Sequence, residues 1–88
     1  MKYISTVLKI QANENDKDSF IKQLMNDEKF DFICHTTINK NQNIHTMLFN
    51  YLNDNRYEAM NDIWDIMKNF PNIKYLNHLF KTKQKEEA

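Results

Sequence analysis

The chain has 88 residues, and its 12 basic and 12 acidic side chains give a formal net charge of zero. Its length allows one small domain, and the 41% of hydrophobic residues is enough for a single core. The balanced charge argues against nucleic acid as a partner, because neutralising phosphates requires an excess of basic side chains.

The chain begins with a predicted strand over residues 2–11, which alternate with a period of two. One side of this strand carries Ile4, Thr6, Leu8 and Ile10, and the other carries Tyr3, Ser5, Val7 and Lys9. After a polar break comes a helix with candidate N-caps at Asp16, Asp18 and Ser19. Its apolar stripe is formed by Phe20, Ile21, Leu24 and Met25. We expect this helix to end near residues 27–29.

Two further strands are predicted over residues 30–38 and 44–52, joined by a polar break of hairpin length at residues 39–43. If Ile38 pairs with Ile44, then Thr36 lies opposite Thr46 and Thr37 lies opposite His45. The pattern therefore indicates an antiparallel hairpin.

A second helix is predicted from Asn55, a suitable N-cap, with Glu58 placed to complete a capping box. Ile63 belongs to both apolar rows of this helix and should be buried, and Pro71 should end the helix. Residues 73–81 fit either a strand or a helix. A strand is favoured because the sheet needs a fourth partner. Residues 82–88 are expected to be a polar, frayed tail beyond a domain of residues 1–81.

The order strand, helix, strand, strand, helix, strand predicts an α+β fold. It is a ferredoxin-like sandwich with an antiparallel sheet in the order 4-1-3-2 and both helices on one face. Phe70, Pro71, Asn72 and Ile73 resemble the break between helix and edge strand in ACT domains and in the ligand-sensing domains of leucine-responsive regulators. The resemblance implies the fold and a tendency to dimerise, and it assigns no functional residue.

Three features of the composition limit the possible chemistry. The single cysteine, Cys34, rules out an internal disulfide and suggests a buried packing residue in a reducing, cytoplasmic setting. No run of 18 apolar residues is present, so we expect no membrane span. Glycine is absent, so phosphate cradles built from glycine are excluded and asparagines such as Asn43 should form the turns.

Candidate catalytic and metal-binding residues are few. His35 lies diagonal to His45 in the predicted hairpin, but no known metal-binding spacing is present. Cys34 and His35 are neighbours on a strand and point to opposite faces, so they cannot form a nucleophilic pair. Asp31 between two phenylalanines is a possible general base, although the start of a strand explains it more simply. We therefore assign no catalytic residue, metal or cofactor.

The predicted hairpin has apolar residues on both faces. Phe32, Cys34, Thr36, Ile38, Ile44, Thr46 and Leu48 form one face. We assign the other face to the open side of the sheet, where helices are absent and a partner would bind. This predicted partner-binding surface comprises Tyr3, Val7, Ile33, His35, His45, Met47, Phe49 and Tyr51. A register shifted by one residue, or a C-terminal helix over the sheet, would remove it.

These patterns favour a non-enzymatic interaction module, a small regulator or inhibitor that binds another protein or a second copy through the open sheet face. Abundant Asn, Lys and Ile are typical of a low-GC bacterium, its phages or its mobile elements. One alternative is a dimeric α/β-barrel enzyme with a pocket between two sheets, lined by His35, His45 and Tyr51. Another is a ligand-sensing domain with the same kind of pocket.

Overall fold

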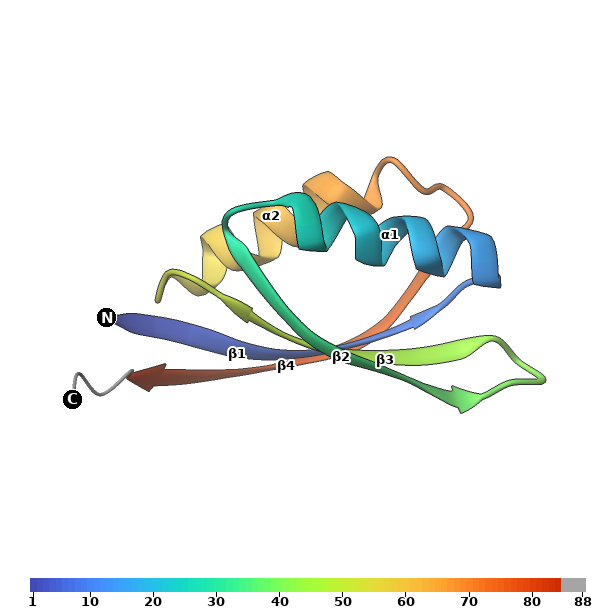
Figure 1. Ribbon diagram of the computed structural model, residues 1–88, viewed down its shortest axis with the longest axis horizontal. Coiled ribbons are helices and arrows are strands. Elements are labelled where there is room, and N and C mark those ends of the chain that lie inside the picture. The colour runs from blue at the N-terminus through green and yellow to red at the C-terminus, as the bar shows by residue number, and fades with distance from the viewer. Residues whose placement is uncertain (85–88) are drawn as a thin grey trace.

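The elements follow one another in the predicted order. The computed structural model describes residues 1–84. Its elements are β1 (Lys2–Gln11), α1 (Glu14–Asn26), β2 (Phe30–Asn39), β3 (Ile44–Tyr51), α2 (Arg56–Met67) and β4 (Lys74–Gln84). All pairs of neighbouring strands are antiparallel, and the sheet order is β2-β3-β1-β4. This is the predicted order read from the opposite edge. Both helices lie on the same side of the twisted sheet (Figure 1), which confirms the α+β, ferredoxin-like fold.

The segment after Pro71 is a strand, as favoured by the sequence. β4 pairs with β1 from Lys74 opposite Gln11 to Gln84 opposite Lys2. The predicted end of the domain at residue 81 is therefore wrong, because residues 82–84 continue this ladder. The side chains of residues 82–84 are exposed, so their polar groups stay in water while the backbone groups pair with β1. The rest of the predicted tail, residues 85–88, lies outside the described residues.

Helix starts were predicted with mixed success. α1 begins after Asn13, whose side-chain oxygen accepts a hydrogen bond from the Asp16 N–H at 2.8 Å. The predicted caps at Asp16, Asp18 and Ser19 are wrong, since these residues lie inside the helix. The predicted cap at Asn55 is confirmed, because its side chain accepts from the N–H groups of Tyr57 and Glu58.

The hairpin between β2 and β3 shows how the chain turns without glycine. Asn43 has a φ of 55°, which is the left-handed region that favours glycine. Asparagine tolerates this region better than other residues with a side chain, because its short amide can bond locally. The expectation that Asn43 belongs to a turn is confirmed.

The core lies between the two helices and one face of the sheet. Ile63, predicted to be buried, is fully buried there. The largest buried side chains come from the central strands and both helices: Ile4, Leu8, Ile10, Met47, Phe49, Phe20, Leu24 and Ile63. Phe30 packs edge-on against Phe49, with ring centroids 5.5 Å apart. Neither helix in residues 1–84 has the length and apolar character that crossing a bilayer requires.

The alternation of β3 was predicted correctly, but its two faces were exchanged. Ile4 lies opposite Tyr51, and Leu8 lies opposite Met47. Directly paired residues share a face, so the odd-numbered residues of β3 join the buried side of β1 under the helices. Phe49 is consequently a core residue, and Leu48 lies on the open face.

The face exchange predicts opposite results at two neighbouring positions. Phe49→Ala should lower the free energy of unfolding by about 3–5 kcal/mol, because it removes a fully buried ring and leaves a cavity. Leu48→Ala should cost about 1 kcal/mol in the monomer, since Leu48 is only half-buried. Urea unfolding at low protein concentration measures both values. Equal losses would contradict the assignment of the faces.

Candidate functional site

The open face of the sheet carries an apolar row that crosses all four strands. Cys34 pairs with Leu48, Leu48 pairs with Val7, and Val7 pairs with Leu79. Paired residues share a face, so these four side chains form a continuous line from β2 to β4. We call this line the apolar row.

Polar rows flank the apolar row on both sides. One comprises Thr36, Thr46, Lys9 and Asn77, and the other comprises Asp31, Asn50, Ser5 and Lys81. The apolar row is thus a narrow strip with a polar margin. Interfaces between proteins commonly have this arrangement of an apolar centre and a polar rim.

The edges of the apolar row are open to solvent. Leu79 on β4 is 67% exposed, and Ile33 beside Cys34 on β2 is 50% exposed. Ile33 is the extra residue of a β-bulge, because Phe32 pairs with Phe49 and the next pair is Cys34 with Leu48. After this bulge, the even-numbered Cys34 lies on the open face, whereas the even-numbered Phe32 before it lies on the covered face.

The bulge also corrects the prediction for the cysteine. Cys34 was expected to be a buried packing residue, but it is exposed on the open face. The strict alternation assumed from the sequence fails at Ile33, where one residue of β2 has no partner on β3. Cys34 and His35 nevertheless point to opposite faces, as predicted.

The structure divides the predicted partner-binding surface. Tyr3 and Val7 lie on the open face with Leu79, and Ile33 borders them from the bulge. The remaining predicted residues are on the face covered by the helices: His35, His45, Met47, Phe49 and Tyr51. Sequence analysis missed Leu48 and Leu79, although Leu48 was placed in the face opposite Phe49. The signal for Leu79 was its alternation with His78 and Phe80.

The two histidines do meet, as their diagonal placement suggested. His35 Nε2 lies 3.0 Å from His45 Nδ1, and Thr37 Oγ1 lies 3.2 Å from the same nitrogen. His45 is fully buried, and its Nε2 lies 3.0 Å from the carbonyl oxygen of Ala12. A carbonyl only accepts, so Nε2 of His45 carries the hydrogen and Nδ1 is the acceptor in the neutral ring. His35 therefore donates to His45.

The charged neighbours of this histidine pair come from α1. Lys17 is nearly buried and pairs with Glu14 at 3.0 Å and with Asp18 at 2.5 Å. The hydrogen bond to Asp18 raises the pKa of Lys17 and lowers that of Asp18. Burial, followed by the Lys17 charge, lowers the pKa of His35. Within residues 1–84 no group of three or more His, Cys, Asp or Glu side chains could hold a metal ion. The histidine pair lies at one end of the core, where His45 is buried.

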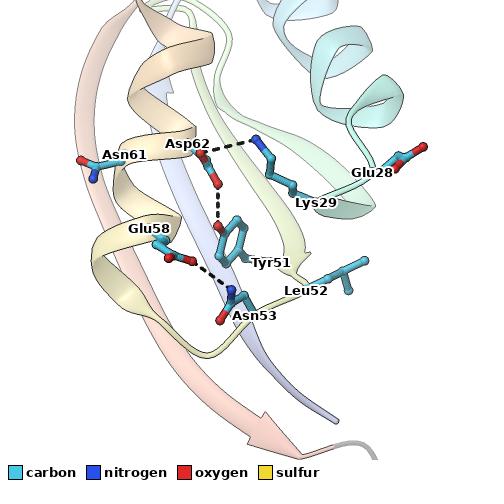
Figure 2. Close-up of a pocket in the computed structure, with 8 residues that line it drawn as sticks. All are labelled: Glu28, Lys29, Tyr51, Leu52, Asn53, Glu58, Asn61 and Asp62. Carbon is cyan, nitrogen blue, oxygen red and sulfur yellow. Dashed lines mark hydrogen bonds and ion pairs between the residues drawn. The ribbon is translucent and has the colours of Figure 1, made fainter.

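A second polar cluster closes the other end of the core, beside a surface hollow of about 630 Å³. Figure 2 shows Tyr51 donating its hydroxyl hydrogen to Asp62, which also pairs with Lys29. The distances are 2.5 Å from the Tyr51 oxygen to Asp62 Oδ2 and 3.6 Å from Lys29 Nζ to Asp62 Oδ1. Glu58 accepts from Asn53 at 2.9 Å. These bonds tie α2 to β3 and to the turn before β2.

The phenol and the carboxylate beside the hollow are both bonded to partners within the fold. Burial and the neighbouring Asp62 carboxylate raise the pKa of Tyr51 far above its usual range, so the phenol stays neutral and acts as a donor. Asp62 already has two partners, and Figure 2 shows Glu28 pointing away from the group. Asp31, the candidate base, is exposed on the open face, away from this hollow.

Comparison of the chain with models of protein families, with curated proteins and with solved structures returns no match. The resemblance to ACT domains and leucine-responsive regulators stays a prediction. The open face is the side of the sheet that neither helix covers, and it includes the exposed Leu79.

Removing the Tyr51 hydroxyl should weaken the fold. Tyr51→Phe should lower the free energy of unfolding at pH 7 by about 1–2 kcal/mol, because a buried bond to a carboxylate is lost. The fold raises the pKa of this phenol above 10.0, so its contribution is present below pH 10 and is lost as pH rises beyond it. Between pH 9 and 11, about one unit either side of the ordinary phenol pKa, the free energy of unfolding should therefore fall less steeply for Tyr51→Phe than for wild type. Denaturant unfolding measures this quantity. Tyr57→Phe, at a residue 86% exposed, is the control and should match wild type.

The histidine pair should make the protein sensitive to acid. The fold lowers the pKa of His35 below 6.5, so its contribution is present above pH 6.5 and is lost as pH falls. His35→Gln keeps a donor for His45 and should flatten the decline in unfolding free energy between about pH 7 and 5. His78→Gln is the control. An unchanged acid decline in His35→Gln would show that other groups cause it.

Proposed function

We propose that this domain is a non-enzymatic interaction module, a small regulator or inhibitor that binds protein through its open sheet face. The observation that carries the proposal is the apolar row from Cys34 to Leu79, bordered by polar rows. No other element of residues 1–84 packs over this face, since both helices lie on the opposite side (Figure 1).

The energetic argument rests on the exposed apolar side chains. Leu79 and Ile33 are largely exposed, and Val7 and Leu48 are half-buried beside them. Burying a large apolar side chain contributes about 1.5–3 kcal/mol, so covering this strip would stabilise a complex. Contiguous apolar surface with a polar border is typical of a binding site for another protein.

The enzymatic alternative loses the residues on which it depended. A pocket between two open faces was expected to be lined by His35, His45 and Tyr51, but these side chains lie on the covered face. The titratable groups on the polar rows are Asp31, Lys9 and Lys81, which stand on different strands of an open surface. This arrangement suits orientation of a partner better than proton transfer.

A capture experiment tests the proposed function. The full chain is immobilised and exposed to a lysate of its source organism, and retained proteins are identified and then rebound in purified form. We expect Leu79→Glu to reduce retention about tenfold or more, because it places a charge in a largely exposed part of the apolar row. The fold should survive, since Leu79 is exposed on an edge strand.

The matched control is Tyr57→Glu, which adds the same charge at an exposed aromatic residue on α2. A partner retained by wild type and by Tyr57→Glu, but lost by Leu79→Glu, supports the proposal, and a second copy of the chain counts as such a partner. Retention that Leu79→Glu leaves unchanged, or retention of no protein by wild type, contradicts it. Circular dichroism of each variant confirms folding.

A further inference from the structure

We propose that the occupant of the open face is a second copy of this chain, with the two copies related by a two-fold axis that runs parallel to the strands. The proposal rests on the proposed function and names its partner. It is carried by the charges at the two edges of one polar row. Asp31 on β2 and Lys81 on β4 stand at opposite ends of the same row, separated by Asn50 and Ser5.

A two-fold axis parallel to the strands exchanges the two edges of the sheet and keeps every row at its own level. β2 of one copy then lies over β4 of the other. Asp31 faces Lys81 of the second copy, and the symmetry repeats the contact, so two ion pairs form at the rim. Complementary rim charges of this kind fix the register of an interface.

The same axis matches the apolar row to itself. Cys34 lies over Leu79 of the second copy, and Leu48 lies over Val7. It also places Lys9 of the second copy over Thr46. Thr46 is only half-buried in the monomer, so its exposed part would be covered by the aliphatic portion of this lysine, whose charged end reaches the rim.

The other two-fold arrangement of the faces gives no such agreement. An axis perpendicular to the strands stacks β2 on β2 and inverts the order of the rows. Asp31 then faces Thr36, and Lys81 faces Asn77, so neither charge meets its opposite. Cys34 would lie over Cys34 of the second copy. The two arrangements therefore differ at the single cysteine.

The size of the face fits a small dimer. Strands about 4.8 Å apart that rise about 3.3 Å per residue give a four-stranded face of roughly 500–600 Å² in projection. Stable interfaces bury about 800 Å² of accessible surface per partner. Accessible surface follows the contours of the side chains and is therefore larger than the projected area of the same face. Two such faces pack about 10 Å apart with nearly aligned strands.

Charge exchange tests the register. Sedimentation velocity of the purified full chain over a range of concentrations should show a dimer. Lys81→Asp and Asp31→Lys should each raise its dissociation constant about tenfold, because each places like charges face to face. The double variant restores opposite charges and should return to within about threefold of wild type. Both residues are exposed on edge strands, so the monomer should keep its circular dichroism spectrum.

Cross-linking tests the direction of the axis. A bismaleimide with a span of about 10 Å matches the separation of packed sheets and should join Cys34 to Leu79→Cys of the second copy. Within one chain these positions are at opposite edges of the sheet, about 14 Å apart at normal strand spacing. Wild type and the control Tyr57→Cys should give little cross-linked dimer. Efficient cross-linking of wild type through Cys34 alone would overturn the proposed axis.

The outcomes separate this inference from the proposed function. A wild type that is monomeric at every concentration overturns the second copy as occupant. If capture of a different protein then still depends on Leu79, the proposed function stands without it. A dimer whose double charge variant is no tighter than the single variants overturns the register. A restored double variant with a Cys34 to Leu79→Cys cross-link supports both the partner and the axis.

Discussion

The fold depends on the pairing of its two central strands, β1 and β3. Their register brings the largest apolar residues of both strands onto one face, where Leu8 lies opposite Met47 and Ile4 lies opposite Tyr51. Both helices cover that face and bury it. A slip of one residue would turn the large side chains of β3 towards solvent, so the buried face fixes the register strongly.

Two polar clusters close the ends of this core. β3 supplies His45 at one end and Tyr51 at the other, and each side chain bonds to a group outside the sheet. His45 bonds to the Ala12 carbonyl before α1, and Tyr51 bonds to Asp62 on α2. Satisfied polar groups at the rim of a core specify how the helices sit on the sheet, because an unpaired buried group is costly. His45 and Tyr51, which the sequence suggested as lining residues of an enzyme pocket, therefore hold the layers together.

The sequence predicted the order of the elements, the turn at Asn43 and the pairing of Thr36 with Thr46, because periodicity and turn residues are local signals. It did not predict which face of β3 is covered. Ile44, Thr46 and Leu48 are nearly as apolar as the residues between them. Alternation separates the two faces of a strand, but it does not tell which of them is buried. The better guide was size, since Met47, Phe49 and Tyr51 have the volume that a core needs.

Strict alternation also failed to predict the faces of β2, for a different reason. Ile33 and Ile38 are both unpaired residues at bulges, and each shifts the side chains that follow it. Bulges depend on contacts with the neighbouring strand and leave little trace in a single sequence. Five of the eight residues predicted for the open face therefore lie on the covered face.

The two edges of the sheet have a consequence for the solubility of the chain. An unpaired edge strand is a template for adding further strands, and growth of this kind leads to fibres. β4 opposes such growth with Lys74, Lys81 and Lys83, whose charges repel a second edge of the same kind. β2 opposes it with its two bulges, which interrupt the row of backbone groups. Both ends of the ladder are thus protected against the open-ended stacking that produces amyloid.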